Sequence, residues 1–84
     1  MYAISFDFNS EELKKEYGDT SKAYNEIEEE LAKFDFVWLN GSVYVNYHGK
    51  NSLVYVYKVI NRLSTLYWFK KSVRDIAVLK IENL

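Results

Sequence analysis

The sequence predicts one α+β domain, spanning residues 1–84, in which a four-stranded antiparallel sheet carries two helices on one face. A length of 84 residues suits a single domain. Hydrophobic residues make up 49% of the chain and aromatic residues 18%, which supplies the material for a core. Apolar side chains also recur at strand or helix spacing in six successive segments, in the order β-α-β-β-α-β.

The first strand is expected over Tyr2–Phe8, because large and small side chains alternate along it. The large side chains, which should face the helices, are Tyr2, Ile4, Phe6 and Phe8. The opposite face carries the smaller Ala3, Ser5 and Asp7, so another molecule could approach closely there.

A helix is expected from about residue 10 to residue 34, with Ser10 as its N-cap. Gly18 should bend or break this helix, and a second N-cap is available among Asp19, Thr20 and Ser21. The apolar stripe of its second half consists of Ala23, Ile27, Leu31 and Phe34. The four glutamates between positions 26 and 30 fall largely outside that stripe, so we interpret them as a solvated face and not as a metal site.

A β-hairpin is the clearest local signal, because two β-rich runs at residues 36–39 and 42–47 flank Asn40-Gly41. This dipeptide suits a type I′ turn, in which both central residues have positive φ. Residues 48–51 should then form a loop in which His48, the single histidine, is a surface residue and not a catalytic one.

Helical spacing predicts the second helix over residues 52–66, followed by an aromatic-anchored turn at 68–71 and a last strand at 73–82. Each helix joins two strands that should be parallel, with a right-handed crossover. The usual solution is a ferredoxin-like sheet with strand order 4-1-3-2 and both helices on one face. The uncovered face is expected to include Tyr44, Val73, Ala77 and Leu79. Because this face is too apolar to stay bare, we expect a two-fold homodimer that buries it.

Composition excludes several classes of protein. The chain has 11 basic and 12 acidic residues, so it lacks the broad positive field of many nucleic-acid-binding proteins. It has no cysteine, which excludes disulfides and thiolate metal sites. It also shows no signal-peptide pattern and no apolar run of membrane-spanning length, so we expect a cytoplasmic protein without membrane contact.

The strand order brings polar residues to one corner of the sheet. The end of the first strand, with Asp7, should lie beside the starts of the third and fourth strands, which carry Ser42, Arg74 and Asp75. A carboxylate there could act as general base toward a ribose 2′-hydroxyl or water, and two carboxylates could hold Mg²⁺. These residue types point to cleavage of a phosphodiester bond.

Substrate contacts are available nearby. Arg74, Lys70 and Lys71 could neutralise phosphate charge, and aromatic side chains such as Tyr44 could stack on bases. Each residue also has a plain structural explanation. Asp7 could pair with Arg74, Ser42 could serve only the turn, Asp75 could cap or pair locally, and the lysines could simply be solvated.

Three ordered blocks of the sequence resemble the virulence-associated protein D (VapD) family. They are MYAISFD at residues 1–7, WLNGSVY at 38–44 and WFKKSVRDI at 68–76. The resemblance implies a ferredoxin-like fold related to the small nuclease-like subunit of CRISPR adaptation complexes, and a homodimer. It further implies an endoribonuclease that acts on RNA and in some bacteria is the toxin of a toxin–antitoxin pair.

On the matching positions, the resemblance implies a catalytic role for Asp7, Ser42 and Asp75. Mg²⁺ is the candidate cofactor, with Asp7 as its ligand, and an antitoxin protein is a candidate partner. Two alternatives stay open: a module of the same fold that binds nucleic acid or an antitoxin without cutting, and a structural dimer whose corner is an inert salt-bridge cluster.

Overall fold

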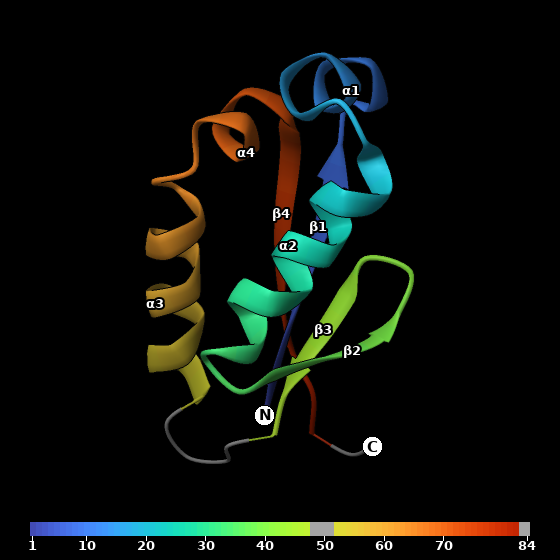
Figure 1. The fold of residues 1–84 in the computed structure, drawn as a ribbon. Coiled ribbons are helices and arrows are strands. Elements are labelled where there is room, and N and C mark those ends of the chain that lie inside the picture. The colour runs from blue at the N-terminus through green and yellow to red at the C-terminus, as the bar shows by residue number, and fades with distance from the viewer. Residues whose placement is uncertain (48–51, 83–84) are drawn as a thin grey trace.

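The computed structural model describes residues 1–47 and 52–82. In this part of the chain the elements are, in order, β1 (Tyr2–Phe8), α1 (Ser10–Tyr17), α2 (Thr20–Ala32), β2 (Phe36–Asn40), β3 (Val43–Asn46), α3 (Ser52–Leu63), α4 (Tyr67–Ser72) and β4 (Val73–Lys80). The strands form one antiparallel sheet in the order β2-β3-β1-β4, which confirms the predicted topology (Figure 1). The loop predicted around His48 lies outside the described residues.

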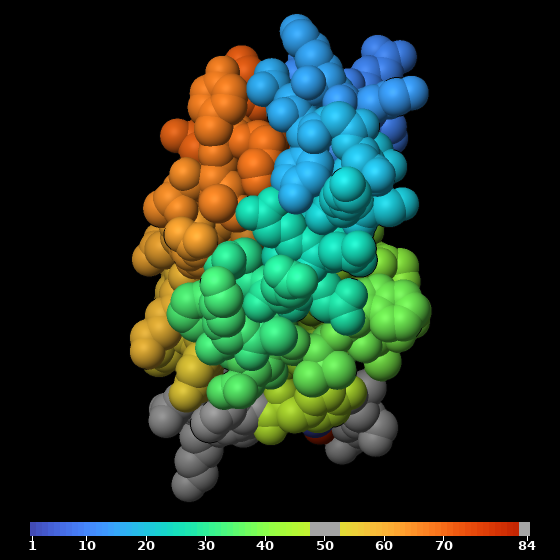
Figure 2. All heavy atoms as spheres, viewed as in Figure 1, coloured from blue at the N-terminus to red at the C-terminus, as the bar shows by residue number. Residues whose placement is uncertain are grey.

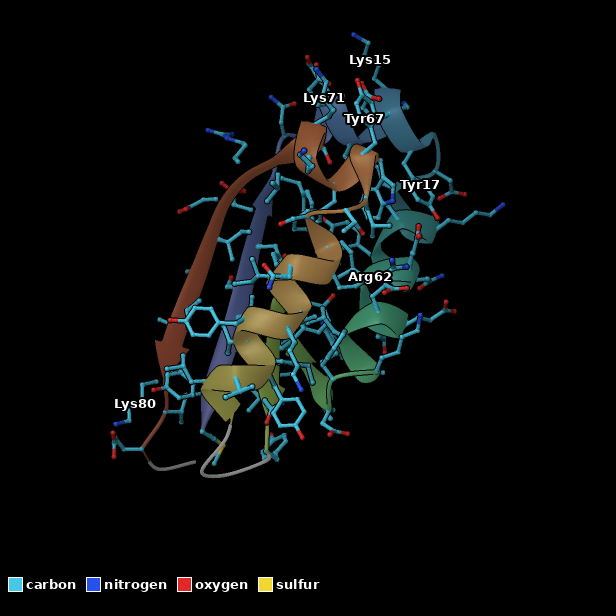
Figure 3. The ribbon with its side chains drawn as sticks, turned by 90° about the vertical axis from the view of Figure 1, so that its left-hand side faces the viewer. Lys15, Tyr17, Arg62, Tyr67, Lys71 and Lys80 are labelled. Atoms are coloured by element: carbon cyan, nitrogen blue, oxygen red, sulfur yellow. The ribbon has the colours of Figure 1, made fainter. Side chains whose placement is uncertain are left out.

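The helices lie on one side of the sheet, and the other side is open, as Figure 3 shows from the edge formed by β4. Side chains of α1 and α2 form a continuous layer over the front of the molecule beside α3 and α4 (Figure 2). Within the described residues, no helix combines the length and the apolar character needed to span a membrane.

The large side chains that alternate along β1 form the centre of the core, as predicted. Ile4, Phe6 and Phe8 are buried against the helices. The ring of Phe69 on α4 meets Phe6 and Phe8 edge-to-face, with centroids 5.5 and 5.7 Å apart. This geometry is the favourable one for aromatic pairs, because the positive ring edge faces the negative ring face.

The predicted first helix is divided into two helices at Gly18, whose φ of 96° ends α1. Asp19 caps α2, as one of the predicted candidates, by accepting hydrogen bonds from the backbone N–H groups of Ser21 and Lys22. The N-cap of α1 is Asn9 and not the predicted Ser10, because the Asn9 side chain accepts a hydrogen bond from the Glu12 N–H at 3.0 Å.

The predicted type I′ turn at Asn40-Gly41 is wrong. Trp38 pairs with Tyr44 and Asn40 pairs with Val43, so Leu39 is an extra residue that bulges out of β2. The bulge keeps Asn40 within the strand, without a positive φ, and moves the turn to Gly41 and Ser42. Gly41 has a φ of 51°, which an L side chain adopts at a cost.

The C-terminal elements also differ from their predicted bounds. The helix expected to reach residue 66 ends at Leu63, and the segment interpreted as a turn forms α4. Phe69 anchors α4 because it is fully buried, and the Ser72 hydroxyl donates a hydrogen bond to the Trp68 carbonyl. β4 begins at Val73 as predicted and ends at Lys80.

Strand register defines the open face, which carries one row of Val37, Val45, Ala3 and Leu79 and a second row of Val43, Ser5 and Ala77. Ala77 and Leu79 therefore lie on the predicted face. The prediction is wrong for Tyr44 and Val73, because these pair with Ile4 and Phe8 and share the helix-covered side with them.

Candidate functional site

Two carboxylates stand directly opposite each other at the end of β1. The β1–β4 register pairs Asp7 with Asp75, and both residues are exposed. Directly opposed residues on antiparallel strands project from the same face, with Cβ atoms about 4.5–5.5 Å apart. Like charges in this arrangement are destabilising, so the pair is not explained by the stability of the sheet.

A β-bulge adjoins this pair. Asp7 pairs with Asp75, and the next β1 residue, Phe8, pairs with Val73, so Arg74 is an extra residue on β4. A bulge bends its strand and re-aims the neighbouring side chains, and bulges are frequent beside active sites. Among the described residues, no ion pair joins Arg74 to Asp7 or Asp75, so the structure does not show the simple cross-strand salt bridge.

Ser42 lies on the other side of β1. Its backbone carbonyl accepts a hydrogen bond from the Phe6 N–H at 3.3 Å, which places Ser42 beside the end of the strand, next to the residue that precedes Asp7. Strand order thus gathers Asp7, Ser42 and Asp75 at one end of the sheet. We call these three residues the carboxylate corner.

Lys70 and Lys71 lie in the last turn of α4, are exposed, and lead directly into β4. The Asn9 N–H donates a hydrogen bond to the Ser72 carbonyl at 2.8 Å, which fixes the end of α4 beside the residue that follows β1. The two lysines are therefore at the same end of the sheet as the carboxylate corner.

Tyr44 does not belong to this site. It is 3% exposed, its ring centroid lies 6.0 Å from that of Phe6, and burial raises the pKa of its hydroxyl to about 12. A ring enclosed by the helices cannot stack on a base, so the interpretation of Tyr44 as a substrate-binding residue is wrong.

Sequence reasoning missed a charged cluster between α2 and α3. Glu30, assigned to a solvated face, is buried and accepts hydrogen bonds from the Arg62 Nε at 2.6 Å and the Lys33 Nζ at 2.8 Å. These bonds hold the pKa of the Glu30 carboxyl at about 2. The sequence does contain a pattern that predicts this burial. Glu30 follows Ile27 by three residues and therefore lies on the same, buried side of the helix.

The residues suited to a metal are few. Within residues 1–47 and 52–82, no three His, Cys, Asp or Glu side chains gather in a way that could hold a metal ion. Asp7 and Asp75 remain as a pair of carboxylates. Such a pair fits Mg²⁺, which usually takes one or two protein carboxylates and completes its shell with water and substrate phosphate.

Comparison with known proteins identifies close relatives, although no family model matches the chain. The chain is 55% identical over 84 residues to a Helicobacter pylori protein named Endoribonuclease VapD, covering 99% of this chain and 89% of the relative. It is 49% identical over 84 residues to the protein of that name from Dichelobacter nodosus, covering 99% and 88%. With that from Haemophilus influenzae it shares 35% identity over 83 residues, covering 99% and 89%.

Proposed function

Because the chain belongs to the VapD family, we propose that it is an endoribonuclease that cleaves RNA phosphodiester bonds at the carboxylate corner. The observation that carries this proposal is the direct pairing of Asp7 with Asp75 at the end of β1, where both residues are exposed. Two like charges held side by side cost stability, and a fold retains such an arrangement where it serves chemistry.

The chemistry follows from the residue types. In the route through the ribose 2′-hydroxyl, Asp7 takes the hydroxyl proton and the 2′-oxygen bonds to the adjacent phosphorus. The bond from phosphorus to the 5′-oxygen breaks, and the leaving oxygen takes a proton from solvent. Arg74, Lys70 and Lys71 offset the charge on the phosphate, and the Ser42 hydroxyl donates a hydrogen bond that orients it.

Asp7 and Asp75 would also be the residues that hold Mg²⁺. When bound, this ion supplies Lewis-acid activation of water, which leads to direct hydrolysis. In that case the two aspartates act as ligands, while the cations of α4 and β4 still bind the phosphate. The two routes leave different RNA ends, so they can be separated by experiment.

We propose further that the chain works as a two-fold homodimer through the open sheet face. Leu79 and Val37 on that face are 49% and 56% exposed, and they flank the buried Val45 and Ala3 in one row. An isologous interface between two such faces would cover this apolar surface. If the two-fold axis runs along the strands, the two copies of Asp7 lie at the same end of the assembly.

A role as the toxin of a toxin–antitoxin pair is also proposed. The edge strand β2 carries exposed Val37, Trp38 and Leu39, and an exposed apolar edge suits strand addition by a protein partner. An antitoxin that covers β2 would use this surface.

The decisive experiment compares RNA cleavage by wild type and Asp7→Asn, with and without EDTA. Loss of a general base lowers the rate by about 10²–10⁴-fold, so Asp7→Asn should be nearly inactive. A cyclic phosphate at the 3′ end identifies attack by the 2′-hydroxyl, and a free 3′-hydroxyl that disappears with EDTA identifies metal-assisted water. If the toxin role is correct, induced wild type stops cell growth and Asp7→Asn does not.

The matched control is Asp19→Asn, which makes the same chemical change at the N-cap of α2, where Asn serves as well as Asp. This variant should cleave RNA at the wild-type rate. Unchanged cleavage by purified Asp7→Asn would refute the catalytic assignment.

A further inference from the structure

The outer face of α4 combines an aromatic ring with two cations. Tyr67, Lys70 and Lys71 are spaced at i, i+3 and i+4, so they share one side of the helix. All three are exposed, Tyr67 at 67%, whereas Phe69 and Ser72 point inward and are buried. The exposed ring of Tyr67 therefore lies on α4, whose opposite side packs in the core.

The last turn of α1 adds two more cations beside this face. Lys14 and Lys15 are both exposed, and α1 packs against α4. Tyr17 and Trp68 join the two helices through an edge-to-face contact with centroids 4.8 Å apart. Figure 3 shows Lys15, Lys71 and Tyr67 at the same end of the molecule, with Lys80 at the opposite end. We call Lys14, Lys15, Tyr67, Lys70 and Lys71 the α1–α4 platform.

The four lysines of the platform form no ion pair with the described residues. In the described part of the chain, ion pairs join Lys33 and Arg62 to Glu30 and Lys80 to Glu82, and none involves a platform lysine. Uncommitted ammonium groups around an exposed ring are the combination with which proteins hold single-stranded nucleic acid, since the lysines bind phosphates and the ring stacks on a base.

The platform also adjoins the carboxylate corner. α4 continues directly into β4, in which Asp75 is the third residue. We propose that the α1–α4 platform binds the single-stranded RNA that flanks the scissile bond and so guides the chain onto Asp7 and Asp75. This inference rests on the proposed nuclease function, and it adds a binding surface that includes Lys14, Lys15 and Tyr67.

The test measures binding of a fluorescent single-stranded RNA of about 12 nucleotides, by anisotropy and at several salt concentrations. The Asp7→Asn background prevents cleavage during the measurement. The double change Lys14→Gln with Lys15→Gln should flatten the slope of log affinity against log salt by about 0.7 for each phosphate that the two lysines neutralise. Tyr67→Ala should weaken binding about fivefold or more, and Tyr67→Phe should restore it, because Phe keeps a ring that can stack on a base.

The matched control is Lys80→Gln, which removes the same charge from the far end of β4 and should leave affinity and salt slope unchanged. Lysines near helix C-termini also stabilise the helix through its dipole. If the lysine variants lower the melting temperature but keep the wild-type salt slope, that structural role is the whole of their function and the platform is refuted. Wild-type affinity and slope in all platform variants would refute it as well.

These outcomes are separable from failure of the nuclease itself. If wild type does not cut RNA, yet the platform variants bind RNA more weakly as described, RNA binding by the platform is supported and the proposed cleavage is refuted. If wild type cuts RNA and the platform variants bind it as wild type does, the cleavage stands and the platform falls.

Discussion

Glu30 is a charged residue that the fold has placed almost out of contact with water. Its side chain is 8% exposed and meets Lys33 on its own helix and Arg62 on α3. The Arg62 side chain remains 44% exposed, so water screens part of the attraction. The cluster therefore orients α2 against α3 more than it adds to overall stability.

We predict that Glu30→Gln destabilises the protein by about 1–2 kcal/mol at neutral pH, because Arg62 and Lys33 lose their charged acceptor. The folded carboxyl has a pKa of about 2 and an ordinary one has 4.5. The unfolded state therefore binds more protons between these values. The contribution of Glu30 is full above pH 4.5 and fades as the pH falls toward 2. Urea unfolding of both proteins from pH 3 to 7 measures this.

Glu29→Gln provides the comparison for that series, because Glu29 is an exposed carboxylate one position earlier on α2. It should change stability little at any pH. A gap between wild type and Glu30→Gln that does not narrow in acid would contradict the assigned pKa.

Capping residues set where α1 and α2 begin. The Asp19 carboxylate accepts hydrogen bonds from two backbone N–H groups at the start of α2, immediately after the break at Gly18. We predict that Asp19→Ala lowers the free energy of unfolding by about 1 kcal/mol, since these donors lose their partner. Asp19→Asn should restore most of it. Thermal melts of wild type, Asp19→Ala and Asp19→Asn measure these differences. If Asp19→Ala were as stable as wild type, Asp19 would have no capping role.

The spacing of apolar residues predicted the first strand correctly, but it missed the bulge in β2 and the short helix α4. The alternation over Tyr2–Phe8 is confirmed, because Ile4, Phe6 and Phe8 pack in the helix-covered core and the residues between them do not belong to it. The bulge at Leu39 was not predictable, since Gly41 can occupy a central position of the turn either after Asn40 or before Ser42. α4 was missed because six residues span fewer than two helical turns, too few to display a period.

The carboxylate corner was predictable for a different reason. Strand order follows from chain connectivity and handedness, and it alone sets which strand ends are neighbours. The direct pairing of Asp7 with Asp75 required the register, and the extra Arg74 required the bulge. Neither can be deduced from residue spacing. Tyr44 was placed on the wrong face because its side follows from its pairing with Ile4, a register that residue spacing does not give.

The proposed homodimer depends on the apolar side chains of the open sheet face. We predict that Leu79→Glu raises the dimer dissociation constant at least about tenfold, because a two-fold interface would receive the new charge twice without a partner. Val54→Glu, at an exposed position on α3 in the helix layer, should leave the dimer intact. Light scattering after gel filtration reports the mass of each. A wild-type monomer, or a dimer that tolerates Leu79→Glu, would place the interface elsewhere.

Met1 and Ile81 exchange backbone hydrogen bonds in both directions, at 2.8 and 3.3 Å, so the two ends of the described chain lie together. They are at the end of the sheet remote from α1 and α4 (Figure 1). An affinity tag or fluorophore fused there stands clear of Asp7 and of the α1–α4 platform. A short linker could also splice these ends, and the chain could be reopened at the exposed Gly18 as a circular permutant that keeps every strand neighbour.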